Sequence, residues 1–172
     1  MGVPVARAAQ RGVMARSKVM RDSQLFDKAI ELYFRPLAGK IGLPLSKVED
    51  GVFEIPSQRF ILRIRLHTGH SRGLNVILRP ASLHKFDENK DHGVLGIGNF
   101  IEFYGGEWKE PSIEIDSEEK FLAQTHRMAE ATQRYAVPYL LGEGKDWEAI
   151  EKMVAKRTEL AVEKIKKYPF LS

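Results

Sequence analysis

Residues 59–66 read Arg-Phe-Ile-Leu-Arg-Ile-Arg-Leu, with apolar residues at every even position and arginines at three of the four odd positions. Successive side chains of a β-strand point to opposite faces, so this stretch predicts a strand with one apolar face and one cationic face. Residues 74–79 alternate in the same way, and segment 68–73 between them contains the glycines of a hairpin connection. The two stretches therefore predict a pair of facing strands in one sheet.

Further strands are predicted before and after this pair. Residues 52–55 form a short apolar run that ends at a Pro-Ser turn. After a long polar connection, residues 94–104 alternate again, although two glycines indicate a bulge at the start of that strand. Residues 113–115 complete the set as a short edge strand. These consecutive runs predict an antiparallel meander of four to five strands.

A helix is predicted before the sheet. Asp22 or Ser23 can cap it, and apolar residues follow at helical spacing up to residue 41. Pro36 lies inside this run, where it lacks an amide donor and its ring clashes with the preceding turn. We therefore expect this helix to kink or break near residues 33–35.

Two helices are predicted after the sheet. The first is capped by Asp116 or Ser117 and has glutamates in its first turn, where the helix dipole favours negative charge. The second begins after Asp146. Its apolar stripe consists of Trp147, Ile150, Val154, Ala161 and Ile165. The order of elements predicts an α+β fold, with an N-terminal helix, the antiparallel meander, and two C-terminal helices packed on one sheet face.

The composition is that of an ordinary globular protein. The chain has 172 residues and a mass of 19.6 kDa, enough for one domain with a sizeable core, and it is 43% hydrophobic and 29% charged. It has no long apolar run, so we expect a soluble, cytoplasmic protein without a membrane span. The absence of cysteine excludes disulfides, thiol nucleophiles and cysteine-ligated metal centres.

The net charge of +4 is distributed unevenly along the chain. Residues 1–90 carry 16 Lys and Arg against 8 Asp and Glu, whereas residues 91–172 carry 11 against 15. The basic half could bind polyanions such as nucleic acid. The acidic half can also neutralise it after folding, and we favour that interpretation because a basic isoelectric point alone is weak evidence for nucleic-acid binding.

Residues 1–21 contain five of these basic residues and no acid. We expect them to form a flexible basic arm in front of a single α+β domain at residues 22–172. An arginine-rich, acid-free segment is also typical of a mitochondrial transit peptide, so organellar targeting stays open as the alternative.

The candidate binding residues are the arginines of the strand pair and its connection: Arg59, Arg63, Arg65, Arg72 and Arg79. Guanidinium groups on one face could bind phosphate or carboxylate groups through paired hydrogen bonds. The alternative, which we favour, is pairing inside the protein with glutamates of other strands. These glutamates are Glu54, Glu102 and Glu114. The arginine-bearing face also lacks an aromatic residue on which a base could stack, since Phe60 has the parity of the apolar face.

Histidines offer the chemistry of a metal site, with His67 and His70 as weak candidate ligands beside the hairpin connection. The long polar connection adds His84, Asp87, Asp91 and His92. Their spacing matches no helical His-Glu-x-x-His motif, and nothing in the sequence brings the two connections together. We therefore favour solvated loop histidines, and we expect neither a metal nor a cofactor.

These patterns rank three functions. The leading hypothesis is a small non-catalytic binding or accessory protein that acts through contact with a protein partner, because the fold pattern is complete and no convincing catalytic constellation is present. The second is polyanion or nucleic-acid binding through the basic arm and the arginine-bearing face. The third is a metal-dependent enzyme that uses the loop histidines. The identity of the partner and the oligomeric state stay open.

Overall fold

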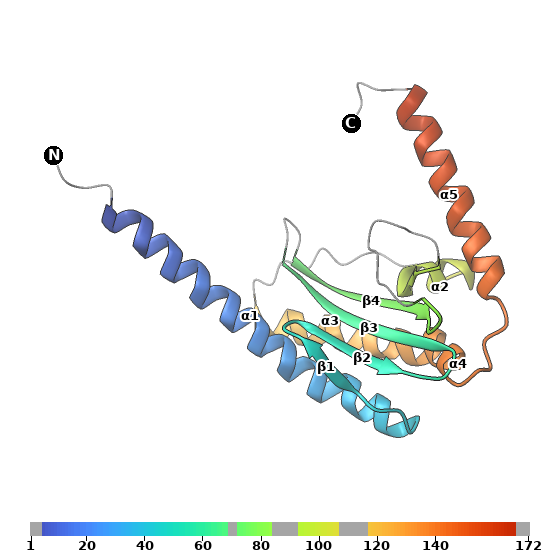
Figure 1. The fold of residues 1–172 in the computed structure, drawn as a ribbon, viewed down its shortest axis with the longest axis horizontal. Helices are drawn as coiled ribbons and strands as arrows, with labels where there is room; N and C mark the ends of the chain where they lie inside the picture. The colour runs from blue at the N-terminus through green and yellow to red at the C-terminus, as the bar shows by residue number, and fades with distance from the viewer. Residues whose placement is uncertain (1–4, 69–71, 84–92, 107–116, 168–172) are drawn as a thin grey trace.

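The computed structural model describes residues 5–68, 72–83, 93–106 and 117–167, and of residues 5–21, 68 and 72 it describes only the backbone. The chain forms a long N-terminal helix, an antiparallel sheet and a group of C-terminal helices (Figure 1). This arrangement confirms the predicted α+β fold. None of the helices in the described ranges is long and apolar enough to cross a membrane.

Within these ranges, five strands pair in the order of the chain and form one antiparallel meander. The strands are β1 Ser46–Glu49, β2 Val52–Pro56, β3 Phe60–Thr68, β4 Arg72–Pro80 and β5 Leu95–Gly96. The hairpin of β3 and β4 follows the predicted alternation, since Leu62 pairs with Leu78 and both are buried. β1 was not predicted from the sequence. Three of its four residues are polar and all four are exposed, so it lacks the alternation of apolar and polar residues that indicates a strand. The predicted strand 113–115 lies outside the described residues.

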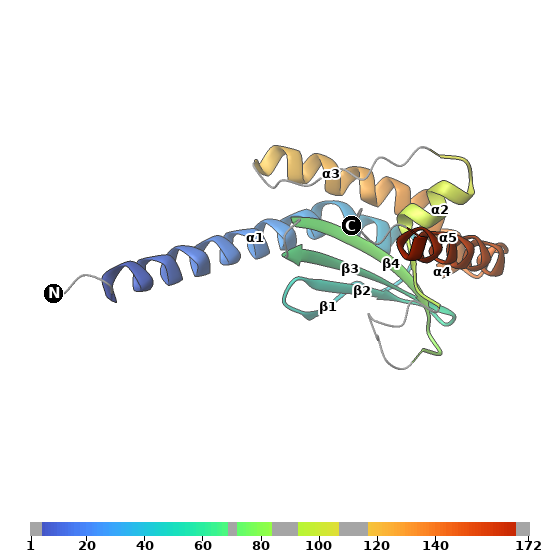
Figure 2. The same cartoon turned by 90° about the horizontal axis from the view of Figure 1, so that it is seen from above.

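Helices α1 Val5–Lys40 and α3 Glu118–Ala131 cover the apolar face of the sheet and lie side by side on it, as Figure 2 shows. The core fills the space between these helices and the strands. Phe26 of α1 is fully buried and packs edge-on against Phe53 of β2, with 5.7 Å between the ring centroids. Removal of this apolar area from water is the main contribution to the stability of such a core.

α1 is one continuous helix, so the predicted start at Asp22 or Ser23 is wrong and the helix does not break at residues 33–35, while the alternative of a kink there stays a prediction. Pro36 lies on the exposed side of the helix, as does Leu32, whose carbonyl would otherwise accept the missing hydrogen bond. Water can satisfy that carbonyl, while the buried side of α1 holds the helix against the sheet.

The backbone of α1 extends well beyond the sheet at its N-terminal end (Figure 1). Because the helix begins at Val5, most of the predicted basic arm belongs to it. The flexibility of that arm, and the boundary of the single domain at residues 22–172, stay predictions.

Residues 94–104, predicted as a strand, form only the two-residue β5 followed by α2 Ile97–Phe103. The buried residues of α2 are Ile97, Phe100 and Ile101. Their spacing of three and one fits one face of a helix, whereas a strand would place Phe100 and Ile101 on opposite faces. Burial of all three side chains therefore favours the helix.

α3 is capped by Ser117, one of the two predicted caps, whose side chain accepts a hydrogen bond of 3.2 Å from the amide of Lys120. The elements that follow are the π-helical turn η1 Thr132–Ala136, α4 Val137–Leu140 and α5 Trp147–Lys167. Pro138 accounts for the wider turn, since its ring would clash with the carbonyl of Arg134 in a regular α-helix.

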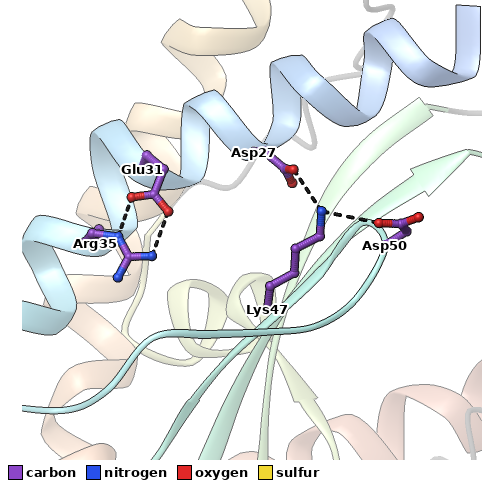
Figure 3. A network of polar contacts seen from close by, with 5 residues as sticks. All are labelled: Asp27, Glu31, Arg35, Lys47 and Asp50. Carbon is purple, nitrogen blue, oxygen red and sulfur yellow. Dashed lines mark hydrogen bonds and ion pairs between the residues drawn. The ribbon is translucent and has the colours of Figure 1, made fainter.

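An ion-pair bridge joins β1 to α1 (Figure 3). The ammonium group of Lys47 lies 2.8 Å from a carboxylate oxygen of Asp27 on α1 and 3.3 Å from one of Asp50, which follows β1. The hydrogen bond to Asp27 raises the pKa of Lys47. One turn along α1, Glu31 accepts a hydrogen bond from Arg35, which lowers the pKa of Glu31. Exposed pairs of this kind contribute little to stability, and of these pairs the contact between Lys47 and Asp27 is the one that links the edge strand to α1.

Candidate functional site

The arginine face is the side of the sheet opposite to α1 and α3, and it carries Glu54, Arg63, Arg65, Ile77 and Arg79. Arg63 pairs with Glu54 across β2 and β3, with 2.8 Å between Nε and Oε1. Both side chains are largely buried, with exposed fractions of 17% and 15%. The internal pairing that the sequence favours therefore occurs at Arg63.

The other two arginines of this face, Arg65 and Arg79, are at least partly buried. Arg79 is buried, and its Nη1 donates a hydrogen bond of 2.5 Å to the carbonyl of Leu83. Arg65 is half-buried and lies opposite Val52, which is buried, just as Ile77 is buried opposite Arg63. We infer that the aliphatic stems of the arginines cover these apolar neighbours.

Two of the candidate arginines lie apart from this group. Arg59 is exposed in the bend before β3, and Arg72 opens β4 with a side chain outside the described residues. Glu102 does not face a strand arginine, because it lies on α2 and pairs with Arg157 of α5. Glu114 lies outside the described residues. The sequence therefore predicted one of these partners, Glu54, correctly.

The candidate metal ligands are not brought together in the described part of the chain. His67 lies exposed near the end of β3. The remaining candidates, His70, His84, Asp87, Asp91 and His92, lie outside the described residues. No group of three metal-ligating side chains occurs within residues 5–68, 72–83, 93–106 and 117–167.

A tyrosine pair lies where α2, α4 and the start of α5 meet. The hydroxyl of Tyr104 donates to Asp146 at 2.9 Å and lies 3.1 Å from the hydroxyl of Tyr139. Tyr104 is 46% exposed as a whole residue, but the partial removal of its hydroxyl group from water, followed by these hydrogen bonds, raises the pKa of Tyr104. Tyr104 therefore stays protonated at neutral pH and acts as a hydrogen-bond donor, not as a base or nucleophile.

α5 begins inside the domain. Trp147 packs against Phe60, Phe100 and Tyr139, with ring centroids between 4.7 and 6.1 Å apart. Ile150, one turn further, is fully buried. The first turns of α5 are therefore part of the core.

Beyond these turns α5 leaves the domain (Figure 1). Every residue from 155 to 167 is exposed, including Val162 at 44% and Ile165 at 60%. The predicted apolar stripe is thus only partly a core stripe, because Ala161 and Ile165 do not pack on the domain. Helical periodicity shows which side of a helix is apolar, but it does not show where the underlying domain ends.

A groove of about 460 Å³ lies between α5 and the segment that leads into β5. It is lined by Gly93, Leu95, Glu151, Lys152, Val154, Ala155, Thr158 and Glu159. The hydroxyl of Thr158 donates to the carbonyl of Val154 at 3.0 Å, so its polar group is satisfied within the helix. The groove therefore combines an apolar lining with three charged residues, Glu151, Lys152 and Glu159.

The α5 wall of this groove continues along the exposed part of the helix. Ala155, Thr158, Val162 and Ile165 follow one another at intervals of three, four and three residues, which places them along one side of a helix. We call these four residues the α5 seam. Leu160 is also exposed, at 51%, but two residues correspond to about 200° around a helix, so Leu160 lies nearly opposite Val162.

Comparisons with protein-family models, with curated proteins and with solved structures found no match. Function is therefore argued from the described surfaces themselves. The arginine face is engaged at Arg63 and Arg79 by contacts inside the protein, and the hydroxyl of Tyr104 is engaged in hydrogen bonds with Tyr139 and Asp146. The groove and the α5 seam differ from both, because they combine apolar side chains with exposure to solvent.

Sequence reasoning missed this surface. The spacing of the α5 seam is visible in the sequence, so a search for three- and four-residue intervals would have found Ala155, Thr158, Val162 and Ile165. The opposite wall was hidden, because Leu95 faces α5 only through the turn from β5 into α2.

Proposed function

We propose that this protein is a non-catalytic binding protein that takes up a helical segment of a protein partner at the groove and the α5 seam. One observation carries the proposal: Val162 and Ile165 continue the groove wall and are 44% and 60% exposed. Single exposed apolar residues are ordinary on protein surfaces. A row of them that runs out of an apolar groove is typical of an interaction site.

The spacing of the seam favours a helix as the ligand. Intervals of three and four residues allow the side chains of a second helix to pack between those of the first. Full burial of a side chain such as Val or Ile contributes about 1.5–3 kcal/mol, so a few such contacts support binding. Glu151 and Glu159 outnumber Lys152 among the charged residues of the groove, which favours a ligand helix that carries basic residues beside its apolar ones.

The other candidate functions find less support among the described residues. Polyanion binding through the sheet would compete with the contact of Arg63 to Glu54 and would require Arg79, which is buried, to become accessible. That hypothesis then depends on the basic residues at the start of α1. The histidine-based enzyme depends on side chains outside the described residues.

Site-specific photo-cross-linking in the native host tests the proposal. A photoreactive amino acid at position 162 should give a discrete cross-linked protein product, because this position faces the bound helix. The same amino acid at position 160 is the matched control, since Leu160 has a similar exposed fraction on the opposite side of α5. The proposal fails if position 162 gives no product, or if both positions give the same products in equal amounts.

A further inference from the structure

We propose that the helix taken up by the groove and the α5 seam is α5 of a second copy of this chain, in antiparallel orientation. This inference rests on the proposed function and names the partner of that same surface. It follows from the complementarity of the seam to itself, from the position of the groove, and from the charges of α5.

The seam is complementary to itself when two copies run in opposite directions. In that arrangement Ala155 packs against Ile165 of the second copy, and Thr158 packs against Val162 of the second copy. Each layer then joins a smaller residue to a larger one, which fills the space between the helices evenly. Two-fold symmetry forms each of these contacts twice.

The chain cannot fill its own groove with its own seam. Ile165 follows Ala155 by ten residues on the same helix, which corresponds to about 15 Å along the axis. A second copy removes this limit, because its Ile165 arrives beside Ala155, where Leu95 forms the opposite wall of the groove. The exposed end of each α5 is therefore covered by the groove of the other copy.

The charges of α5 favour the antiparallel orientation. The last turn of the helix carries Lys164, Lys166 and Lys167 and no acid, whereas the first turns carry Glu148 and Glu151 with one base, Lys152. Antiparallel pairing brings the wholly basic end of one helix beside the other end of its partner, where two glutamates outnumber Lys152, and it also opposes the two helix dipoles. Parallel pairing would place the lysines of both copies together, and this like-charge contact is unfavourable.

The mass of the full chain in solution tests the inference. Two paired helices bury less than the roughly 800 Å² per partner of a standard interface, so we expect a dimer that forms in the micromolar range. Sedimentation equilibrium from about 1 µM to about 1 mM should show a mass that rises from 19.6 kDa toward twice that value. A chain that stays monomeric over this range overturns the inference.

Two substitutions on opposite sides of α5 separate the seam from the rest of the helix. Val162→Gln should weaken dimerisation by about tenfold or more, because each dimer loses two buried valines. Leu160→Gln is the matched control and should change the dimerisation constant by less than about twofold. Both side chains are exposed in the monomer, so equal melting temperatures will confirm that both variants fold. Equal effects of the two substitutions on dimerisation overturn the inference.

The absence of cysteine allows the orientation to be tested by disulfide trapping. A mixture of the Thr158→Cys and Val162→Cys chains should form a mixed disulfide on mild oxidation, because these positions meet in antiparallel pairing. Disulfides formed by each variant with itself indicate parallel pairing and overturn the inference, as does the absence of any disulfide.

Failure of this inference can be distinguished from failure of the proposed function. A monomeric chain that is cross-linked through position 162 to a different protein removes the second copy as the partner and leaves the proposed function in place. A monomeric chain that gives no cross-link at position 162 removes both.

Discussion

Arg157 of α5 and Glu102 of α2 form an ion pair of 2.5 Å, and the same guanidinium group donates to Asn99 at 3.0 Å. Arg157 lies two residues after Ala155, the first residue of the α5 seam, so its contacts help to set the direction in which the helix leaves the domain. Both partners of the ion pair are about half exposed. The position of the groove thus depends partly on a contact that water can reach.

Arg157→Gln should lower the free energy of unfolding by less than about 1 kcal/mol, because an exposed ion pair gains little over the hydration of its partners. Urea denaturation of both proteins measures the difference. Lys152→Gln, an exposed change on the same helix, is the control and should be close to neutral. A loss above about 2 kcal/mol for Arg157→Gln would show that the pair contributes to stability like a buried one.

The central hairpin could be predicted because its pattern is local. Alternation along residues 59–66 assigns each side chain to one face, and a facing strand with the same alternation leaves one register that buries both apolar sets. The pairing of Arg63 with Glu54 followed from the same pattern, since both lie on the face that the apolar residues do not occupy.

The groove could not be predicted because it depends on contacts between distant segments. Residues 94–104 alternate like a strand, and only the joint burial of Phe100 and Ile101 selects the helix α2. The exposure of Ile165 could not be predicted either. Ile165 lies on the same predicted apolar stripe of α5 as Ile150, but the domain covers only the beginning of the helix. Periodicity carries no information about the extent of the neighbouring layer.

Glu54→Gln should lower the free energy of unfolding by about 1–3 kcal/mol, because it removes the carboxylate from a largely buried guanidinium group. The control is Lys28→Gln, which breaks the Lys28–Glu118 pair, where both side chains are more than half exposed. This second change should be close to neutral. Equal losses in urea denaturation would mean that burial of Arg63 does not strengthen its pairing with Glu54.

Gly144→Ala should destabilise the fold, because an added Cβ would overlap with the ring of Tyr139, which is buried. Overpacking of this kind costs about 1–3 kcal/mol. Gly39→Ala is the matched control, because the space around Gly39 is open and this residue lies in the last turn of α1. Alanine there should leave the free energy of unfolding unchanged or raise it by up to about 1 kcal/mol. Urea midpoints that shift in the same direction for both variants would contradict the expected overlap.

Tyr104→Phe should make stability less sensitive to alkaline pH. Burial and the hydrogen bonds to Tyr139 and Asp146 raise the pKa of Tyr104 in the folded state above its ordinary value of 10.0. The stabilisation linked to its proton is therefore complete below about pH 10 and is lost as the pH rises through the raised pKa, because the unfolded chain releases the proton first. Between about pH 9 and about pH 11, the free energy of unfolding should fall more steeply for the unmodified chain than for Tyr104→Phe. The control Tyr33→Phe should keep the steeper fall, and the same steepness in all three proteins would show that Tyr104 does not hold its proton in this way.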